Sequence, residues 1–191
     1  MASLLRALCA AALALAASPA AAQAAADAAA ASYLRLLQAS RHVEQFKQVA
    51  AVSARVFAAR GPGSDSEYAQ LMGVIAAADL SDANECLVTL YRGQELTQED
   101  VATLISIFES PLGKKLLEQS ERMLLAAIER GGQQPMPPDA FTEDEKRAMR
   151  EIRENPSFLK YGRMTANQRF ATGMIDCIGQ SDAVRKSGIR Y

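Results

Sequence analysis

The chain has 191 residues, of which 49% are hydrophobic and 23% are charged, an ordinary globular composition and enough length for one domain with its own core. Its formal net charge is −1. A chain this close to neutral produces no strong electrostatic field, which argues against nucleic acid as a partner.

The first 24 residues have the pattern of a secretory signal peptide. Arg6 forms a short basic segment, residues 7–17 are apolar, and Ala22-Gln23-Ala24 supplies the small residues that precede a cleavage site. The apolar run is too short to span a bilayer, which takes about 20 residues, and no second apolar run of that length follows. We therefore expect cleavage near Ala24/Ala25, which leaves residues 25–191 as a soluble domain in the periplasm or secreted from the cell.

The remainder predicts an all-α fold, a single domain of about six helices that form helical hairpins. Apolar residues recur at helical spacing, and no run of alternating β-branched residues indicates a strand. A long first helix is expected over residues 32–60. A second helical region is expected over residues 65–91 with a kink near Ser81, and a last helix over residues 156–184.

Cleavage would remove Cys9 and leave Cys86 and Cys177 in an oxidising compartment, where disulfides persist. A disulfide between them is the economical interpretation, and two buried free thiols are the alternative. The bond would close a loop of about 90 residues and contribute roughly 4–5 kcal/mol in the chain-entropy description. Two sulfurs and one distant histidine do not make a metal site, so neither a metal nor another cofactor is expected.

A helix restart is predicted between residues 96 and 119. Thr97 with Asp100 has the form of a capping box and begins one helix. Ser110 ends that helix because it precedes a proline, and it caps a second helix with Pro111 at the first position. The second helix should end at Gly131, within a linker near residues 131–140.

The same arrangement recurs 45 residues further along the chain. Thr142 and Glu145 form a full capping box, Asn155-Pro156 takes the place of Ser110-Pro111, and Lys160 corresponds to Lys115. One interpretation is a duplicated helix–Ser/Asn-Pro–helix unit. The other is that both segments use the commonest way of starting helices, since few other positions match.

Residues that carry catalysis are scarce. His42 is the only histidine, and its neighbours one helical turn away include no carboxylate or second ligand, so we interpret it as an ordinary surface or half-buried residue. Arg147, Arg150 and Arg153 alternate with glutamates, as on a solvated helix face. With no phosphate-binding loop, metal-ligand spacing or nucleophile motif, the sequence predicts no catalytic residues and no metal ligands.

Gly113 breaks a local rule, because glycine in the first turn of a helix costs about 1 kcal/mol relative to alanine. Lys114 and Lys115 follow it at the positive end of the helix dipole. Three interpretations are open: another helix backbone packs closely against Gly113, the corner binds a partner, or the glycine has no special role.

Residues 91–119 resemble the central motif of a bacterial exported domain-of-unknown-function family, number two thousand and fifty-nine. That motif has a Thr-x-Glu-Glu helix start, an aromatic pair, Ser-Pro-x-Gly and a lysine. The matching positions are Thr97, Glu99, Phe108, Ser110, Pro111, Gly113 and Lys115. Ile107 and Asp100 depart from it conservatively. The resemblance implies an exported helical domain and supplies no activity.

Two functions from different classes fit the sequence. The first is a non-catalytic interaction or structural module of the cell envelope, which binds an envelope protein or another copy of itself. The second is a periplasmic enzyme of hydrolase type whose active site cannot be recognised from the spacing of residues in the sequence. A concave site with convergent carboxylates of shifted pKa would favour the enzyme, and a convex body with an apolar patch would favour the binding module.

Overall fold

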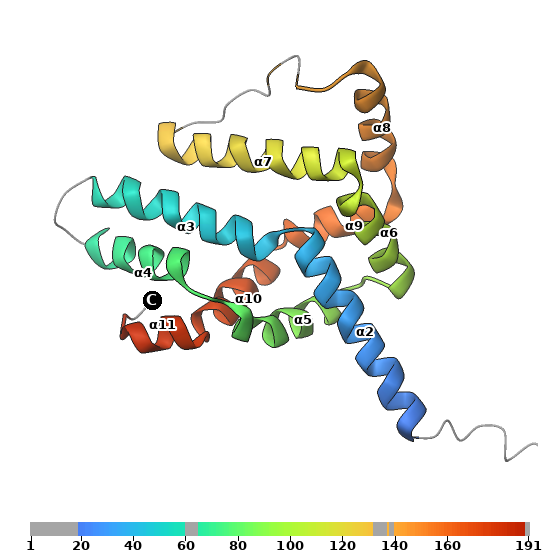
Figure 1. Cartoon of the computed structure of the whole chain (residues 1–191), viewed down its shortest axis with the longest axis horizontal. Helices are drawn as coiled ribbons and strands as arrows, with labels where there is room; N and C mark the ends of the chain where they lie inside the picture. Colours follow the sequence, from blue (N-terminus) through green and yellow to red (C-terminus); the bar gives the residue numbers. More distant parts are fainter. Residues whose placement is uncertain (1–18, 60–64, 132–136, 138–139, 190–191) are drawn as a thin grey trace, which may run out of the picture.

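A computed structural model describes residues 19–59, 65–131, 137 and 140–189 (Figure 1). All regular elements within these ranges are helices, which confirms the all-α prediction. Most of the predicted signal peptide and most of the predicted linker near residues 131–140 lie outside the described ranges.

The predicted long first helix is wrong, because the chain breaks between α2 (Pro19–Ala39) and α3 (His42–Ala58). Arg41 at the break has φ 56°, in the left-handed region that a residue with a side chain rarely adopts. Its guanidinium lies 3.5 Å from the buried carboxylate of Glu121 on α7 (Pro111–Arg130). This tertiary contact favours a helix break, although the sequence has no glycine or proline at this point. The break makes His42 the first residue of α3.

The second predicted region divides near Ser81, where a kink was expected. It forms α4 (Asp65–Ala77), the short 3₁₀ turn η1 (Ser81–Ala83) and α5 (Asn84–Arg92). Helix α4 packs along α3 and runs antiparallel to it (Figure 1). A small apolar core joins these two helices to the C-terminal end of the chain. It includes Ala50, Leu71, Ile75, Ile178 and Val184.

The predicted helix restarts are confirmed in both hairpins, α6 (Gln98–Glu109) with α7, and α8 (Glu143–Glu154) with α9 (Pro156–Thr165). The Thr97 and Thr142 side chains each accept a hydrogen bond in a complete capping box. Ser110 and Asn155 cap the helices that begin at the following prolines. Sequence-local capping therefore sets the boundaries of four helices.

Two ion pairs link the two hairpins. Lys115 of the first hairpin lies 2.8 Å from the Glu145 carboxylate of the second, and Lys160 of the second lies 2.8 Å from the Asp100 carboxylate of the first. Each lysine thus binds the capping carboxylate of the other hairpin at an equivalent position. Such reciprocity is the pattern of two units related by a two-fold axis, and it favours the duplication interpretation.

The predicted last helix is divided into α9, α10 (Gln168–Gly179) and α11 (Asp182–Ser187). Cys177 on α10 and Cys86 on α5 form the predicted disulfide, with sulfur atoms 1.99 Å apart and Cα atoms 5.5 Å apart. The bond holds α10 against α5, and Cys177 is part of the main core. That core gathers residues of α2, α5, α6, α9 and α10, with Leu36, Leu87, Tyr91, Val101 and Leu104 most deeply buried.

A pocket between the two hairpins

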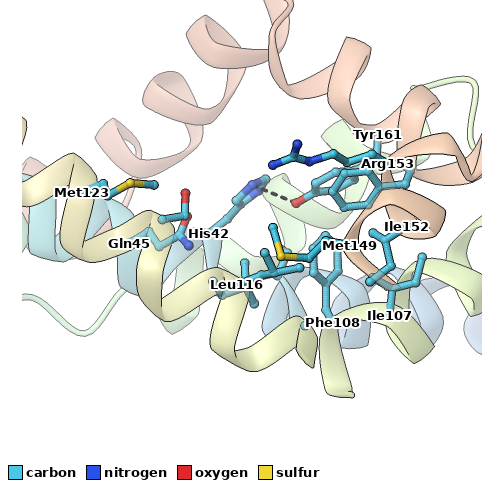
Figure 2. Close-up of a pocket in the computed structure, with 15 residues that line it drawn as sticks. His42, Gln45, Ile107, Phe108, Leu116, Met123, Met149, Ile152, Arg153 and Tyr161 are labelled. Atoms are coloured by element: carbon cyan, nitrogen blue, oxygen red, sulfur yellow. Dashed lines mark hydrogen bonds between the residues drawn. The ribbon is translucent and has the colours of Figure 1, made fainter. Parts of the chain in front are cut away.

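The break before α3 places His42 between two tyrosines. The hydroxyl of Tyr91 on α5 hydrogen-bonds the Nδ1 atom of His42, and the hydroxyl of Tyr161 on α9 lies 2.9 Å from Nε2 (Figure 2). The Tyr161 ring also stacks on the imidazole, with centroids 5.7 Å apart. A neutral imidazole has one donor and one acceptor nitrogen, so one tyrosine donates a hydrogen bond and the other accepts one. Both ring nitrogens are therefore occupied.

Burial keeps this cluster uncharged. It lowers the pKa of His42 from 6.5 to about 4, because the imidazolium form would lose its hydration. Burial also raises the pKa of Tyr91 and the pKa of Tyr161 above the ordinary value for tyrosine. At neutral pH the three side chains are neutral and polar. His42 is half-buried, one of the two environments expected from the sequence, but its tyrosine partners were not expected.

A cavity of about 370 Å³ opens beside the cluster. Side chains from α3, α6, α7, α8 and α9 line it, and most are apolar (Figure 2). Leu116 and Met123 form the α7 side, and Met149 and Ile152 form the α8 side. Volume and composition are those of a small-molecule site, which is concave, mostly apolar and supplied with a few polar groups.

Equivalent positions of the two hairpins line this cavity together. Pairs of lining residues separated by 45 positions are Ile107 and Ile152, Phe108 and Arg153, Gly113 and Phe158, and Leu116 and Tyr161. The cavity thus lies where the two hairpins meet and is built from both. The position of the cavity is consistent with the two ion pairs, because they hold the hairpins side by side.

Arg153 departs from this near-symmetry. Its equivalent, Phe108, is buried in the core, whereas Arg153 is an exposed cation at the cavity. The cavity lining, as far as the described residues form it, contains no aspartate or glutamate. The prediction of a solvated face agrees with the exposure of Arg153 and missed its position at the cavity, which depends on contacts between helices far apart in sequence.

The structure supports the close-packing interpretation of Gly113. A β-carbon at this position would lie 1.9 Å from the carbonyl oxygen of Ile107, at the end of α6. The Ser110 hydroxyl closes the same corner, since it donates to that carbonyl oxygen at 2.7 Å and accepts from the Gly113 amide at 2.9 Å. Pro111 begins α7, as predicted.

The other motif residues divide between structural contacts and solvent. Phe108 packs edge-on against the Tyr161 ring, with centroids 5.1 Å apart. Glu99 and Lys114 are exposed. Lys115, predicted as part of a partner surface, has its ammonium group between Glu145 and the Phe141 ring, whose centroid lies 5.0 Å away. The motif therefore builds the α6–α7 corner and one wall of the cavity.

Comparisons with known proteins supply no identity: no family model, curated protein or solved structure matches this chain. The family resemblance of residues 91–119 therefore stays a prediction. Among the described residues, no three histidine, cysteine, aspartate or glutamate side chains gather as a metal site would require. None of the helices described is both long enough and apolar enough to cross a membrane.

Proposed function

We propose that this chain is an exported, non-catalytic binding module of the bacterial cell envelope, and that the cavity between its two hairpins is the binding site. The observation that carries the proposal is the cavity itself, about 370 Å³ in volume and lined mostly by apolar side chains. Sites for small molecules have this size and character.

The chemistry beside the cavity supports binding over hydrolysis. A histidine acts as a general base when one ring nitrogen can reach the proton to be removed and a second group orients the ring. Both ring nitrogens of His42 are hydrogen-bonded to tyrosine hydroxyls. Among the cavity-lining residues that the structure describes, none is a carboxylate. The hydrolase alternative therefore has no supporting arrangement here.

Export is supported by the burial pattern of α2 and by the disulfide. Residues 20–25 are exposed, and the first fully buried residue of α2 is Tyr33. Cleavage after Ala24 would therefore leave the core intact. We expect mass spectrometry of protein from a periplasmic fraction to find Ala25 as the N-terminus. An intact Met1 on such material would contradict export with cleavage.

A neutral apolar dye, phenylnaphthylamine, tests the binding site. We expect its fluorescence to rise on saturable binding to the mature protein. Ser120 lines the cavity and is exposed on α7, so Ser120→Phe should fill the space and abolish binding without unfolding the chain. Ser106→Phe is the matched control, because Ser106 is an exposed serine on α6 outside this cavity. Equal binding by both variants, or no binding by the unmodified protein, would overturn the proposal.

A further inference from the structure

We propose that the molecule bound between the hairpins is amphipathic, with a single anionic head group held by Arg153 and an alkyl chain held by the apolar walls. The inference rests on the binding function proposed above and specifies the chemistry of its ligand. Carboxylate and phosphate are the head groups that a guanidinium binds with two parallel hydrogen bonds.

The first argument is the unused charge of Arg153. Of the other cations on α8, Lys146 lies 2.7 Å from Glu143 and Arg147 lies 3.5 Å from Asp144. Arg150 pairs with no residue that the structure describes, but it does not line the cavity. Arg153 has no hydrogen bond or ion pair with any residue that the structure describes. In Figure 2 its side chain extends along Tyr161 toward the His42 side of the cavity. A cation at a cavity without a protein anion offers that charge to a ligand.

The second argument is that the cavity has one charged end. The position that holds a buried phenylalanine in the first hairpin, Phe108, holds Arg153 in the second. Around this cation the remaining polar groups are neutral, because burial keeps His42 and Tyr161 uncharged. One anion therefore suffices, and a second anionic group on the ligand would meet no cation among the described lining residues.

The third argument is the apolar character of the rest of the lining. Leu116, Leu117, Met123 and Met149 supply an apolar surface from α7 and α8. The methionines are unbranched and adapt their shape to a chain of variable conformation. An alkyl chain is removed from water along these apolar side chains while its head group remains at Arg153. The size of the cavity suits one small molecule in place of a folded partner.

Calorimetric titration of the full mature chain tests the inference with decanoate, its uncharged counterpart decanol, and decyl phosphate. We expect the unmodified protein to bind decanoate or decyl phosphate about tenfold more tightly than decanol. The anion that binds more tightly, decanoate or decyl phosphate, identifies the head group as carboxylate or phosphate. Arg153→Gln should abolish the preference by weakening anion binding about tenfold while decanol binding is unchanged. Arg150→Gln is the matched control, since Arg150 is exposed one turn earlier on α8 and does not line the cavity.

The outcomes separate this inference from the function on which it rests. Equal binding of decanol and both anions, unaffected by Arg153→Gln, would overturn the anionic head group and leave an apolar binding site. An equal loss in Arg150→Gln would indicate attraction to the surface charge of α8 and would also overturn the inference. Failure of all three ligands, with phenylnaphthylamine still bound, would exclude the amphipathic class. Failure of the dye as well would refute the binding site itself.

Discussion

The carbonyl oxygen of Ile107 faces Gly113 so closely that a β-carbon there would lie 1.9 Å away from it. Both groups are backbone atoms at the junction of α6 and α7, so no side-chain rotation relieves the clash. We expect Gly113→Ala to destabilise the fold by about 1–3 kcal/mol through overpacking, measured by urea unfolding. Gly113→Leu should be at least as destabilising.

Gly162 provides the control for this prediction. It also lies in a helix, α9, but a β-carbon there would meet nothing within 4 Å. Gly162→Ala should therefore stabilise by up to about 1 kcal/mol, through helix propensity and a less flexible unfolded chain. If both variants raised the unfolding midpoint, close packing at Gly113 would be disproved.

The parts of the fold that the sequence predicted depend on neighbouring residues. Thr97, Ser110 and Thr142 cap helices through amides within three residues along the chain, so their roles are readable from spacing alone. The cysteine pair was predictable for a different reason, since only two candidates remain after the predicted cleavage.

The features that the sequence missed depend on residues far apart along the chain. The break at Arg41 is an example, because Arg is unfavourable in a left-handed conformation and the compensating Glu121 lies 80 residues away. The partners of His42 are 49 and 119 residues distant. The spacing of residues along one helix does not reveal these contacts. The cavity depends on both the break at Arg41 and the packing of the two hairpins.

The lowered pKa of His42, which is half-buried between Tyr91 and Tyr161, predicts a dependence of stability on pH. Its pKa is about 4 in the folded protein and 6.5 when unperturbed, so between these values the unfolded chain binds more protons. Stability should therefore fall as the pH drops from about 6.5 to about 4, by up to about 3 kcal/mol. His42→Gln should remove most of this dependence of the unfolding free energy on pH, measured by urea unfolding at several pH values. As the only histidine, His42 can be titrated directly by NMR, and a midpoint near 6.5 would contradict the prediction.

The disulfide predicts a large effect of reduction. It joins α5 to α10 across a sequence separation of 91 residues, for which loop entropy predicts a loss of about 4–5 kcal/mol when the bond is removed. We expect the double variant Cys86→Ala, Cys177→Ala to unfold at much lower urea concentration than the oxidised protein. A thiol assay on the mature protein under denaturing, non-reducing conditions should find neither Cys86 nor Cys177 free, and labelling of both would show that the bond does not form.

The two exchanged lysines should contribute unequally, although they occupy equivalent positions. Asp100 is nearly inaccessible, with 8% of its side chain exposed, and it also accepts hydrogen bonds from Thr97 and Ser157. Lys160→Met would leave this carboxylate buried without its cation, at a cost of about 1–3 kcal/mol. Lys115 and Glu145 are 37% and 28% exposed, so water replaces the lost partner and Lys115→Met should cost less.

The pH dependence separates the Lys160 pair from a simple packing effect. The Lys160 ammonium, with the Thr97 and Ser157 hydrogen bonds, lowers the pKa of Asp100 below its ordinary value. A lowered carboxyl pKa stabilises the fold above the unfolded value of about 4, and that stability is lost as the pH falls below it. Lys160→Met should therefore reduce stability at neutral pH and also weaken its decline in acid, below the range in which His42 titrates. Urea unfolding of both lysine variants at pH 7 and pH 3 measures this. Equal losses of stability for the two variants, with unchanged acid profiles, would contradict the unequal contribution predicted for the two ion pairs.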